Sequence, residues 1–186
     1  MVQLTKIYTR GGDKGQTSLG DGKRISKTSL RIQAIGAVDE TNAALGVCTL
    51  FLTPNFIKSI RHIQNDLFDI GADLCVPENS AKKSLSLKEM QVTWLEKEMD
   101  RFNESLPPLS SFILPGGSAA STHLHLARTI TRRAERDVSA LSEQEDVNQE
   151  ILIYLNRLSD YLFVLCRVLN DNGATDILWV PGKTQR

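Results

Sequence analysis

The stretch that decides the fold runs from Phe112 to Arg136 and reads FILPGGSAASTHLHLARTITRRAER. An aromatic residue that we expect to be buried leads into a Pro-Gly-Gly turn. Ser118 then stands at the N-cap position of a helix, where its hydroxyl can accept from a free backbone N–H. Apolar or small residues follow at alternating spacings of four and three, which is typical of a helix packed in a bundle. This seam consists of Ala120, Leu124, Ala127, Thr131, Ala134, Val138 and Leu141.

The helix face beside this seam is rich in positive charge. Four arginines fall within positions 128–136, and Glu135 and Asp137 offset only part of their charge. Guanidinium groups spaced by four residues form an array of planar donors that suits several phosphate oxygens at once. The alternative is a solvated face or a salt-bridge patch between subunits, because charge runs are common on bundle surfaces. The stripe consists of Ser121, His125, Arg128, Arg132 and Glu135, flanked by Arg133 and Arg136.

Length and composition are those of an ordinary globular protein. The 186 residues predict a single domain, 1–186, with a sizeable core. Lys+Arg and Asp+Glu both number 22, so nothing global indicates a nucleic-acid or membrane partner. The start lacks a signal-peptide pattern, and no apolar run approaches the ~20 residues of a membrane span. Three widely spaced cysteines favour reduced thiols, and together these features predict a cytoplasmic protein.

Residues 1–30 form an irregular, glycine-rich arm. Its informative part is Thr9 to Ser18, TRGGDKGQTS, in which glycines let backbone N–H groups turn toward an anion and hydroxyls add donors. The segment is not a Walker A loop, because no Gly-Lys-Ser/Thr follows at the required spacing. A glycine-rich segment of this kind is also typical of a mobile chain end.

Four further helices are predicted around the arginine-rich one. The first covers about 30–52, and the second begins at Thr53-Pro54, an N-cap followed by proline. The third has an apolar stripe of Met90, Trp94, Leu95, Met99 and Phe102 and ends before a Pro-Pro pair, and the fifth runs from about 147 to 170. The fold class is therefore all-α, a five-helix bundle over 31–171. The tail, 172–186, either docks as an extended segment or stays loose.

Several kinds of site are excluded by the residues themselves. A di-iron bundle site requires Glu-x-x-His pairs, and none of His62, His123 and His125 completes one. Zinc-ligand spacing is absent, as are a Gly-x-Ser-x-Gly elbow and a Cys/His pairing for acyl transfer. A phosphate-rich ligand held by arginines survives this elimination.

Four blocks together resemble the PduO-type ATP:cob(I)alamin adenosyltransferases. They are TRGGDKG from Thr9, FILPGG from Phe112, HLARTITRRAER from His125 and NRLSD from Asn156. Their order and spacing agree with the family across nearly the whole chain, and the arginine-rich string is specific. Gly11 departs from the Thr or Asn frequent in the family, but neighbouring glycines keep the backbone freedom of the loop.

The resemblance implies a five-helix bundle that assembles as a homotrimer, with ATP bound between adjacent subunits. It implies transfer of the 5′-deoxyadenosyl group of ATP to cob(I)alamin, with release of triphosphate and with Mg²⁺ accompanying the nucleotide. A flavin-type reductase and an adenosylcobalamin-dependent client enzyme are the protein partners that this reaction suggests. The magnesium ligands, the corrinoid preference and the choice between synthesis and salvage are not indicated.

The family's site residues carry over by position. Its corrinoid-side aromatic falls on Phe112, which is otherwise read as core packing before a turn. Its intersubunit salt bridge falls on Asp39 and Arg128, which we expect to orient the site while Arg132 acts on the triphosphate. Its ATP contacts fall on Thr9, Arg10, Gly11, Gly12, Thr17, Ser18, Lys27, Arg132, Arg133, Ala134, Glu135, Arg136 and Asn156.

Two other functions remain compatible with the sequence. One is a carrier that binds nucleotide or corrinoid and delivers adenosylcobalamin without turnover. The other is a structural bundle whose arginines only hold a trimer together, although such a trimer would not need the loop from Thr9 to Ser18. Turnover separates the enzyme from the carrier.

Overall fold

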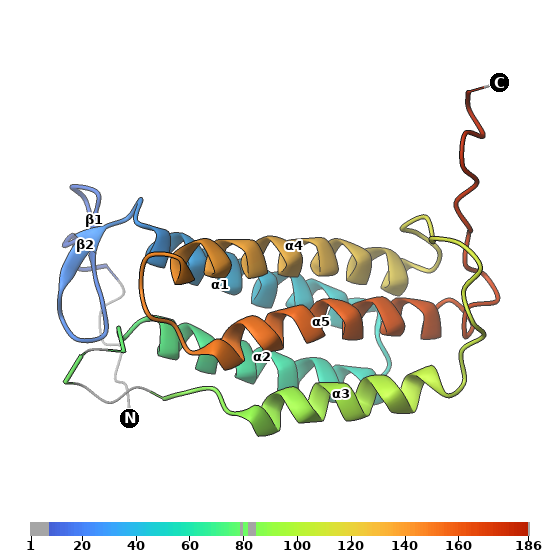
Figure 1. Cartoon of the computed structure of the whole chain (residues 1–186), viewed down its shortest axis with the longest axis horizontal. Helices are drawn as coiled ribbons and strands as arrows, with labels where there is room; N and C mark the ends of the chain where they lie inside the picture. Colours follow the sequence, from blue (N-terminus) through green and yellow to red (C-terminus); the bar gives the residue numbers. More distant parts are fainter. Residues whose placement is uncertain (1–7, 79, 82–84, 186) are drawn as a thin grey trace.

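A computed structural model of the chain describes residues 8–78, 80–81 and 85–185. Within these residues the chain forms five α-helices and a two-stranded hairpin. The helices are α1 (Leu30–Cys48), α2 (Pro54–Leu74), α3 (Glu89–Asn103), α4 (Ala119–Ser142) and α5 (Gln149–Val168), with a 3₁₀ turn η1 (Thr49–Phe51) after α1. Successive helices run in opposite directions along one bundle (Figure 1). The predicted all-α five-helix bundle is therefore confirmed.

Helix α4 begins and packs as its sequence predicts. Ser118 is the N-cap, and its hydroxyl accepts from the Ser121 backbone N–H at 3.1 Å. Every residue of the predicted seam is buried, with exposed fractions of 7% or less. The helix packs against α1 and α5, so its arginine-rich stripe emerges at the edge of the core.

The predicted stripe of α3 is wrong at its first residue. Met90 is 76% exposed, whereas Val92 and Leu95 point into the core with Phe102. The rest of the predicted stripe faces the core, because Leu95 and Phe102 are buried and Trp94 and Met99 pack against them where α3 meets α5. The other three helices match their predicted positions to within a few residues at each end.

The two ends of the bundle carry different appendages. Strands β1 (Gln16–Ser18) and β2 (Arg24–Ser26) pair antiparallel and form a small hairpin in the arm, beside the start of α1 (Figure 1). Leu19, in the turn of the hairpin, is buried at 6% exposure. The neighbouring Gly20 N–H donates to the Cys75 carbonyl at 2.8 Å, which joins the hairpin to the end of α2. The tail lies at the opposite end of the bundle (Figure 1). The predicted arm segment 1–7 lies outside the described residues.

The tail docks as an extended segment, which is one of the two alternatives that the sequence left open. Ile113 and Leu178 form an antiparallel bridge, and the Leu114 N–H donates to the Ile177 carbonyl at 2.8 Å. In the part of the chain that the structure describes, no helix combines the length and apolar character needed to cross a bilayer.

Candidate functional site

The arginines of α4 differ sharply in their surroundings. Arg132 is exposed, and no ion pair engages it among the described residues. Arg133 pairs with Glu40 of α1, so one predicted nucleotide ligand is neutralised within the chain. Arg136 donates to the Arg132 carbonyl at 3.1 Å, and the buried Nε of Arg128 has no hydrogen-bond partner among the described residues. The array therefore keeps unneutralised guanidinium groups.

Two predicted nucleotide residues meet where α4 packs on α5. The Asn156 side-chain amide donates to Glu135 at 2.9 Å, and Arg157 donates to the Asn156 oxygen at 2.7 Å. Arg157 also donates to Glu96 of α3 at 2.8 Å. These contacts hold the Asn156 side chain in one orientation next to the arginine-rich face. A hydrogen-bonded network of this kind keeps polar groups in fixed positions.

The arm is folded on itself around its glycines. A Cβ at Gly12 would lie 2.9 Å from the Lys27 ammonium nitrogen, so the loop and the end of this lysine side chain are in close contact. Arg24 donates to the Gly11 carbonyl at 2.5 Å and to the Ser18 hydroxyl at 3.1 Å. Our sequence reasoning missed Arg24, because its position opposite Ser18 depends on the register of the hairpin.

The arm also contains a backbone feature typical of anion-binding loops. Arg10 adopts a positive φ of 59°, and the glycine-rich turn continues from it to Gly15, whose φ is 77°. Successive N–H groups in such conformations point to one side and can surround an anion. Thr9 and Thr17 lie in the same loop and hairpin, which the structure therefore brings together with Lys27.

Phe112 is not buried, and this expectation is wrong. Its side chain is 78% exposed, so core packing cannot explain an aromatic residue at this position. The ring lies beside Trp179 of the tail, with ring centroids 6.1 Å apart. A hollow of about 570 Å³ opens here, lined by Leu109, Ser110, Ser111, Phe112, Phe163 and Trp179. Sequence reasoning missed Phe163 and Trp179, because Phe163 reaches the hollow from α5 and Trp179 reaches it only through the docked tail.

The two halves of the predicted site lie far apart in one chain. The arm is at one end of the bundle, and the tail that pairs with Phe112 is at the other (Figure 1). Asp39 is exposed on α1, and among the described residues it forms no ion pair with Arg128. A single copy therefore does not assemble the complete constellation.

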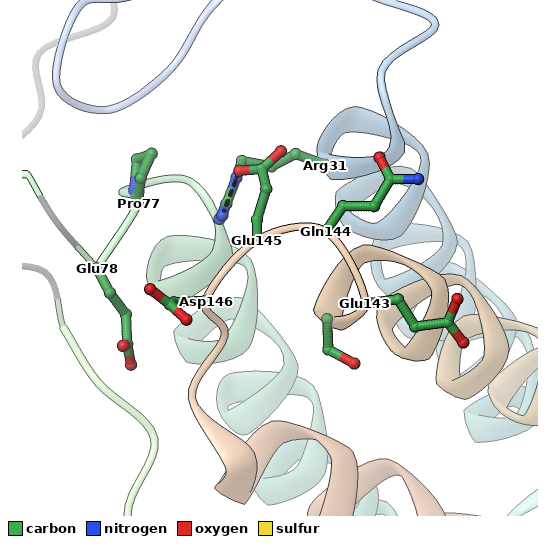
Figure 2. Close-up of a pocket in the computed structure, with 8 residues that line it drawn as sticks. Arg31, Pro77, Glu78, Glu143, Gln144, Glu145 and Asp146 are labelled. Atoms are coloured by element: carbon green, nitrogen blue, oxygen red, sulfur yellow. Dashed lines mark hydrogen bonds and ion pairs between the residues drawn. The ribbon is translucent and has the colours of Figure 1, made fainter.

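A hollow near the arm has the wrong charge for a phosphate. It measures about 360 Å³ and is lined by Glu78, Glu143, Glu145 and Asp146, with Arg31 (Figure 2). Arg31 is 3% exposed, forms an ion pair with Glu145 at 2.8 Å and donates to the Leu74 carbonyl at 2.8 Å. This hollow is therefore a structural junction, and its carboxylates would repel triphosphate.

The thiols and the buried imidazole do not supply a nucleophile. Burial raises the pKa of Cys48 to about 11 and that of Cys166 to about 12, so both are protonated near neutrality. Burial, followed by the charge of Arg128, lowers the pKa of His125 below its ordinary 6.5, against a smaller opposing effect of Asp176. Neither Cys48 nor Cys166 is therefore an activated nucleophile.

Comparison with known proteins finds similar sequences among the cobalamin and corrinoid adenosyltransferases. The chain is 47% identical to a cobalamin adenosyltransferase of Cupriavidus metallidurans, with 95% of each chain covered. It is 46% identical to a corrinoid adenosyltransferase of Mycobacterium tuberculosis, covering 97% of this chain and 96% of that one.

Solved structures agree along nearly the whole chain. A PduO-type ATP:corrinoid adenosyltransferase from Lactobacillus reuteri, in a phenylalanine-to-alanine variant complexed with cobalamin and ATP, matches with a TM-score of 0.90 at 39% identity. The match covers 94% of this chain and 99% of that one. An arginine-to-lysine variant complexed with ATP matches with a TM-score of 0.87 at 39% identity, covering 94% and 100% of the two chains.

The overall fold is thus shared with a solved protein named as an ATP:corrinoid adenosyltransferase. The sequence profile of the cobalamin adenosyltransferases matches residues 7–169, which is most of the length. The chain belongs to the cobalamin adenosyltransferase family.

Proposed function

We propose that this protein transfers the 5′-deoxyadenosyl group of ATP to the cobalt of cob(I)alamin, giving adenosylcobalamin and triphosphate. The observation that carries the proposal is the whole-length likeness to an ATP:corrinoid adenosyltransferase complexed with both cobalamin and ATP. The exposed aromatic, the free arginines and the glycine arm add independent support, because each suits one part of those two ligands.

The arm and α4 would bind the nucleotide. The arm, 1–30, offers the backbone and hydroxyl donors of Thr9, Arg10, Gly11, Gly12, Thr17 and Ser18, together with the ammonium of Lys27. The bundle, 31–171, offers Arg132 and Arg136 to the phosphates, and the fixed amide of Asn156 beside Glu135 to polar groups of the nucleoside. Arg133 and Ala134 complete the predicted set, and Arg133 would exchange Glu40 for phosphate.

The reaction needs no activated protein nucleophile. The electron pair of cob(I)alamin attacks the ribose C5′ in line, a cobalt–carbon bond forms, and the C5′–oxygen bond breaks. The bonding pair leaves with triphosphate while the cobalt is formally oxidised from Co(I) to Co(III). Guanidinium and ammonium groups placed on the leaving group stabilise its growing charge, and they act strongly where water is excluded.

Mg²⁺ would enter the site bound to the phosphates of the nucleotide. No cluster of three metal-ligating side chains occurs among the described residues. Mg²⁺ commonly keeps several waters and binds through phosphates and one or two carboxylates, so the residues present fit a nucleotide-borne ion. Such an ion would neutralise part of the triphosphate charge.

Phe112 would form the corrinoid side of the site. Cob(II)alamin is difficult to reduce while an axial ligand donates to its cobalt. An apolar ring pressed against the lower face of the corrin would exclude that ligand and favour reduction to cob(I)alamin. The exposure of Phe112 above an apolar hollow suits this role, because a free face is available for a planar ligand.

The active unit would be a homotrimer with each site between adjacent subunits. The separation of the arm from Phe112 in one chain supports this arrangement, since a partner can bring the missing half (Figure 1). The exposed carboxylate of Asp39 and the half-buried Arg128, neither of which forms an ion pair among the described residues, suit an intersubunit pair. A flavin-type reductase and an adenosylcobalamin-dependent client enzyme would act before and after it.

Turnover separates this enzyme from a carrier that only delivers adenosylcobalamin. The purified protein is incubated with ATP, Mg²⁺ and chemically reduced cobalamin, and the visible spectrum is followed. The proposal predicts many adenosylcobalamin molecules per protein, together with equimolar triphosphate. Formation of no more than one product per site, with both ligands bound, would establish the carrier.

A further inference from the structure

Three buried polar side chains form a cluster at the end of α5 that the proposed reaction does not use. The side chains of Arg167 and Asp176 are 6% and 4% exposed, and the Arg167 Nε donates to Asp176 at 3.0 Å. The amide of Asn170 donates to the other oxygen of Asp176, also at 3.0 Å. Buried charges of this kind persist only when they are paired and hydrogen-bonded, and here both conditions are met.

The cluster holds the two connections that flank Phe112. The Asn170 oxygen accepts from the Ser118 N–H at 3.0 Å, and its amide also donates to the Gly116 carbonyl at 3.2 Å. A Cβ at Gly117, where φ is 103°, would overlap the Asn170 side chain, so the turn closes directly on this residue. Arg167 adds a hydrogen bond of 2.8 Å to the Pro107 carbonyl.

Beyond Asp176 the tail lies against the segment that contains Phe112. The Trp179 N–H donates to the Phe112 carbonyl at 2.7 Å, and the Ser111 hydroxyl donates to the Trp179 carbonyl at 2.8 Å. The Phe112 and Trp179 rings are tilted against each other at an interplanar angle of 56°. Because Phe112 is exposed, these tail contacts and the turn at Gly116 place its ring, while core packing does not.

We propose that Asn170 and Asp176 are positioning residues for the corrinoid face of the site, acting on Phe112 through the turn and the tail. The proposal rests on the proposed function, because it assigns Phe112 to the corrin. Asn170 fixes where the chain enters helix α4, and Asp176 fixes where the tail begins. A shift of ~1 Å in a group that must press on the substrate can cost ~100-fold in rate.

The test uses Asn170→Ala in a Trp94→Phe background, where Trp179 is the remaining tryptophan of the chain. The anisotropy of its fluorescence reports whether the tail is docked, independently of activity. We expect a lower anisotropy, a loss of four-coordinate cob(II)alamin in the electron paramagnetic resonance spectrum, and kcat at least about tenfold lower. The KM for ATP should stay within about twofold, because Asn170 bonds Ser118, Gly116 and Asp176, none of which is assigned to the nucleotide.

Ser111→Ala is the second variant and should leave the bundle folded, because among the described residues the Ser111 hydroxyl bonds the tail and no helix. It should move the same readouts in the same direction by a smaller amount. Asn65→Ala, which removes an exposed amide bonded to Arg61 of its own helix, is the matched control and should move none of them.

Two results would overturn the inference. One is a mobile Trp179 with unchanged four-coordinate cob(II)alamin and unchanged kcat, which would show that docking does not position Phe112. The other is equal loss of ATP affinity and kcat in Asn170→Ala, which would indicate a general structural role. Failure of the proposed function is distinguished by the Trp94→Phe parent, which would then produce no adenosylcobalamin while its Trp179 anisotropy remained high.

Discussion

At the scale of single residues, exposure separates the functional side chains from the structural ones. Phe112 is exposed on an apolar hollow, and Arg132 is exposed and unpaired among the described residues, whereas Arg31 is buried and fully bonded. Burial of a charged group requires partners, so an exposed arginine without one is available to a ligand. The residues that would touch substrate are therefore those that cost the fold least to replace.

Replacement of Phe112 by alanine should leave folding and ATP affinity intact while adenosylation falls steeply. The side chain is 78% exposed, so its loss removes little buried area, but the corrin loses the ring that excludes an axial ligand. Turnover and nucleotide binding are measured side by side. Phe68→Ala removes another exposed phenylalanine, on α2, and should change neither quantity. Unchanged turnover in the Phe112 variant would refute its assignment to the corrin.

Replacement of Arg132 by alanine should lower kcat/KM at least about tenfold. A charge-assisted contact is worth ~1.5–3 kcal/mol, and ~1.4 kcal/mol corresponds to a factor of ten in rate. Arg61→Ala on the surface of α2 removes the same charge elsewhere and serves as the control. Equal rates in the two variants would mean that the triphosphate does not meet α4 at this residue.

At the scale of elements, α4 works as the axis of both the core and the site. Its seam packs on α1 and α5, its middle presents the arginines, and the Pro-Gly-Gly connection from Phe112 leads into its N-cap. Contacts from neighbouring helices hold the site residues: Glu40 of α1 on Arg133, and Asn156 of α5 on Glu135. A change at the start of α4 would therefore also affect the proposed corrinoid side of the site.

Ser118→Ala should lower the free energy of unfolding by about 1 kcal/mol, the usual cost of losing an N-cap. The hydroxyl accepts from the Ser121 N–H and donates to the Leu169 carbonyl at 2.9 Å. For a chain of this length, that loss lowers the melting temperature by ~2–4 °C in a thermal scan at fixed protein concentration. Ser142→Ala, at the other end of the same helix, bonds only Ser139 and should shift it less.

At the scale of the whole molecule, the arrangement of the chain supports the proposed assembly of several copies. Its nucleotide arm and its aromatic lie at opposite ends of one bundle (Figure 1). Exposed apolar side chains also cluster where α1 ends, at Val47, Leu50 and Phe51. Both features suit an assembly in which neighbouring copies cover apolar surface and complete each other's sites.

Sedimentation equilibrium should accordingly give a mass three times that of the chain.

In a double-mutant cycle on kcat/KM, Asp39→Asn and Arg128→Lys should show a coupling energy of ~0.5 kcal/mol or more. Asp39→Asn combined with the distant Arg61→Lys should be additive within ~0.3–0.5 kcal/mol. Additivity in both cycles would argue against the intersubunit pair, whatever the mass of the assembly.

Stability should fall on acidification below about pH 6.5 because of His125. Burial lowers the pKa of this imidazole, and neither ring nitrogen has a partner among the described residues. The unfolded chain therefore binds a proton near pH 6.5, while the folded chain binds it only at lower pH. The free energy of unfolding is consequently unaffected by this group above pH 6.5 and falls below it. Melting temperatures across this range should drop less in His125→Gln than in the exposed control His62→Gln.

The sequence by itself determined the number of helices, the N-cap of α4, its buried seam and the family. Period and capping are local properties that neighbouring residues settle together, and a string as specific as HLARTITRRAER needs no coordinates. The composition of the glycine arm also predicted an anion-binding loop, and the hairpin of the structure sets how its residues are arranged.

The tertiary structure alone decided which way the key side chains face and what they meet. Phe112 is exposed, Met90 is exposed, Arg133 is paired with Glu40, and the tail docks beside Phe112 through Asp176. Each of these depends on segments distant in sequence, and a periodic pattern carries no information on which distant partner packs against a given face. The local code therefore specified the elements, and long-range packing specified the site.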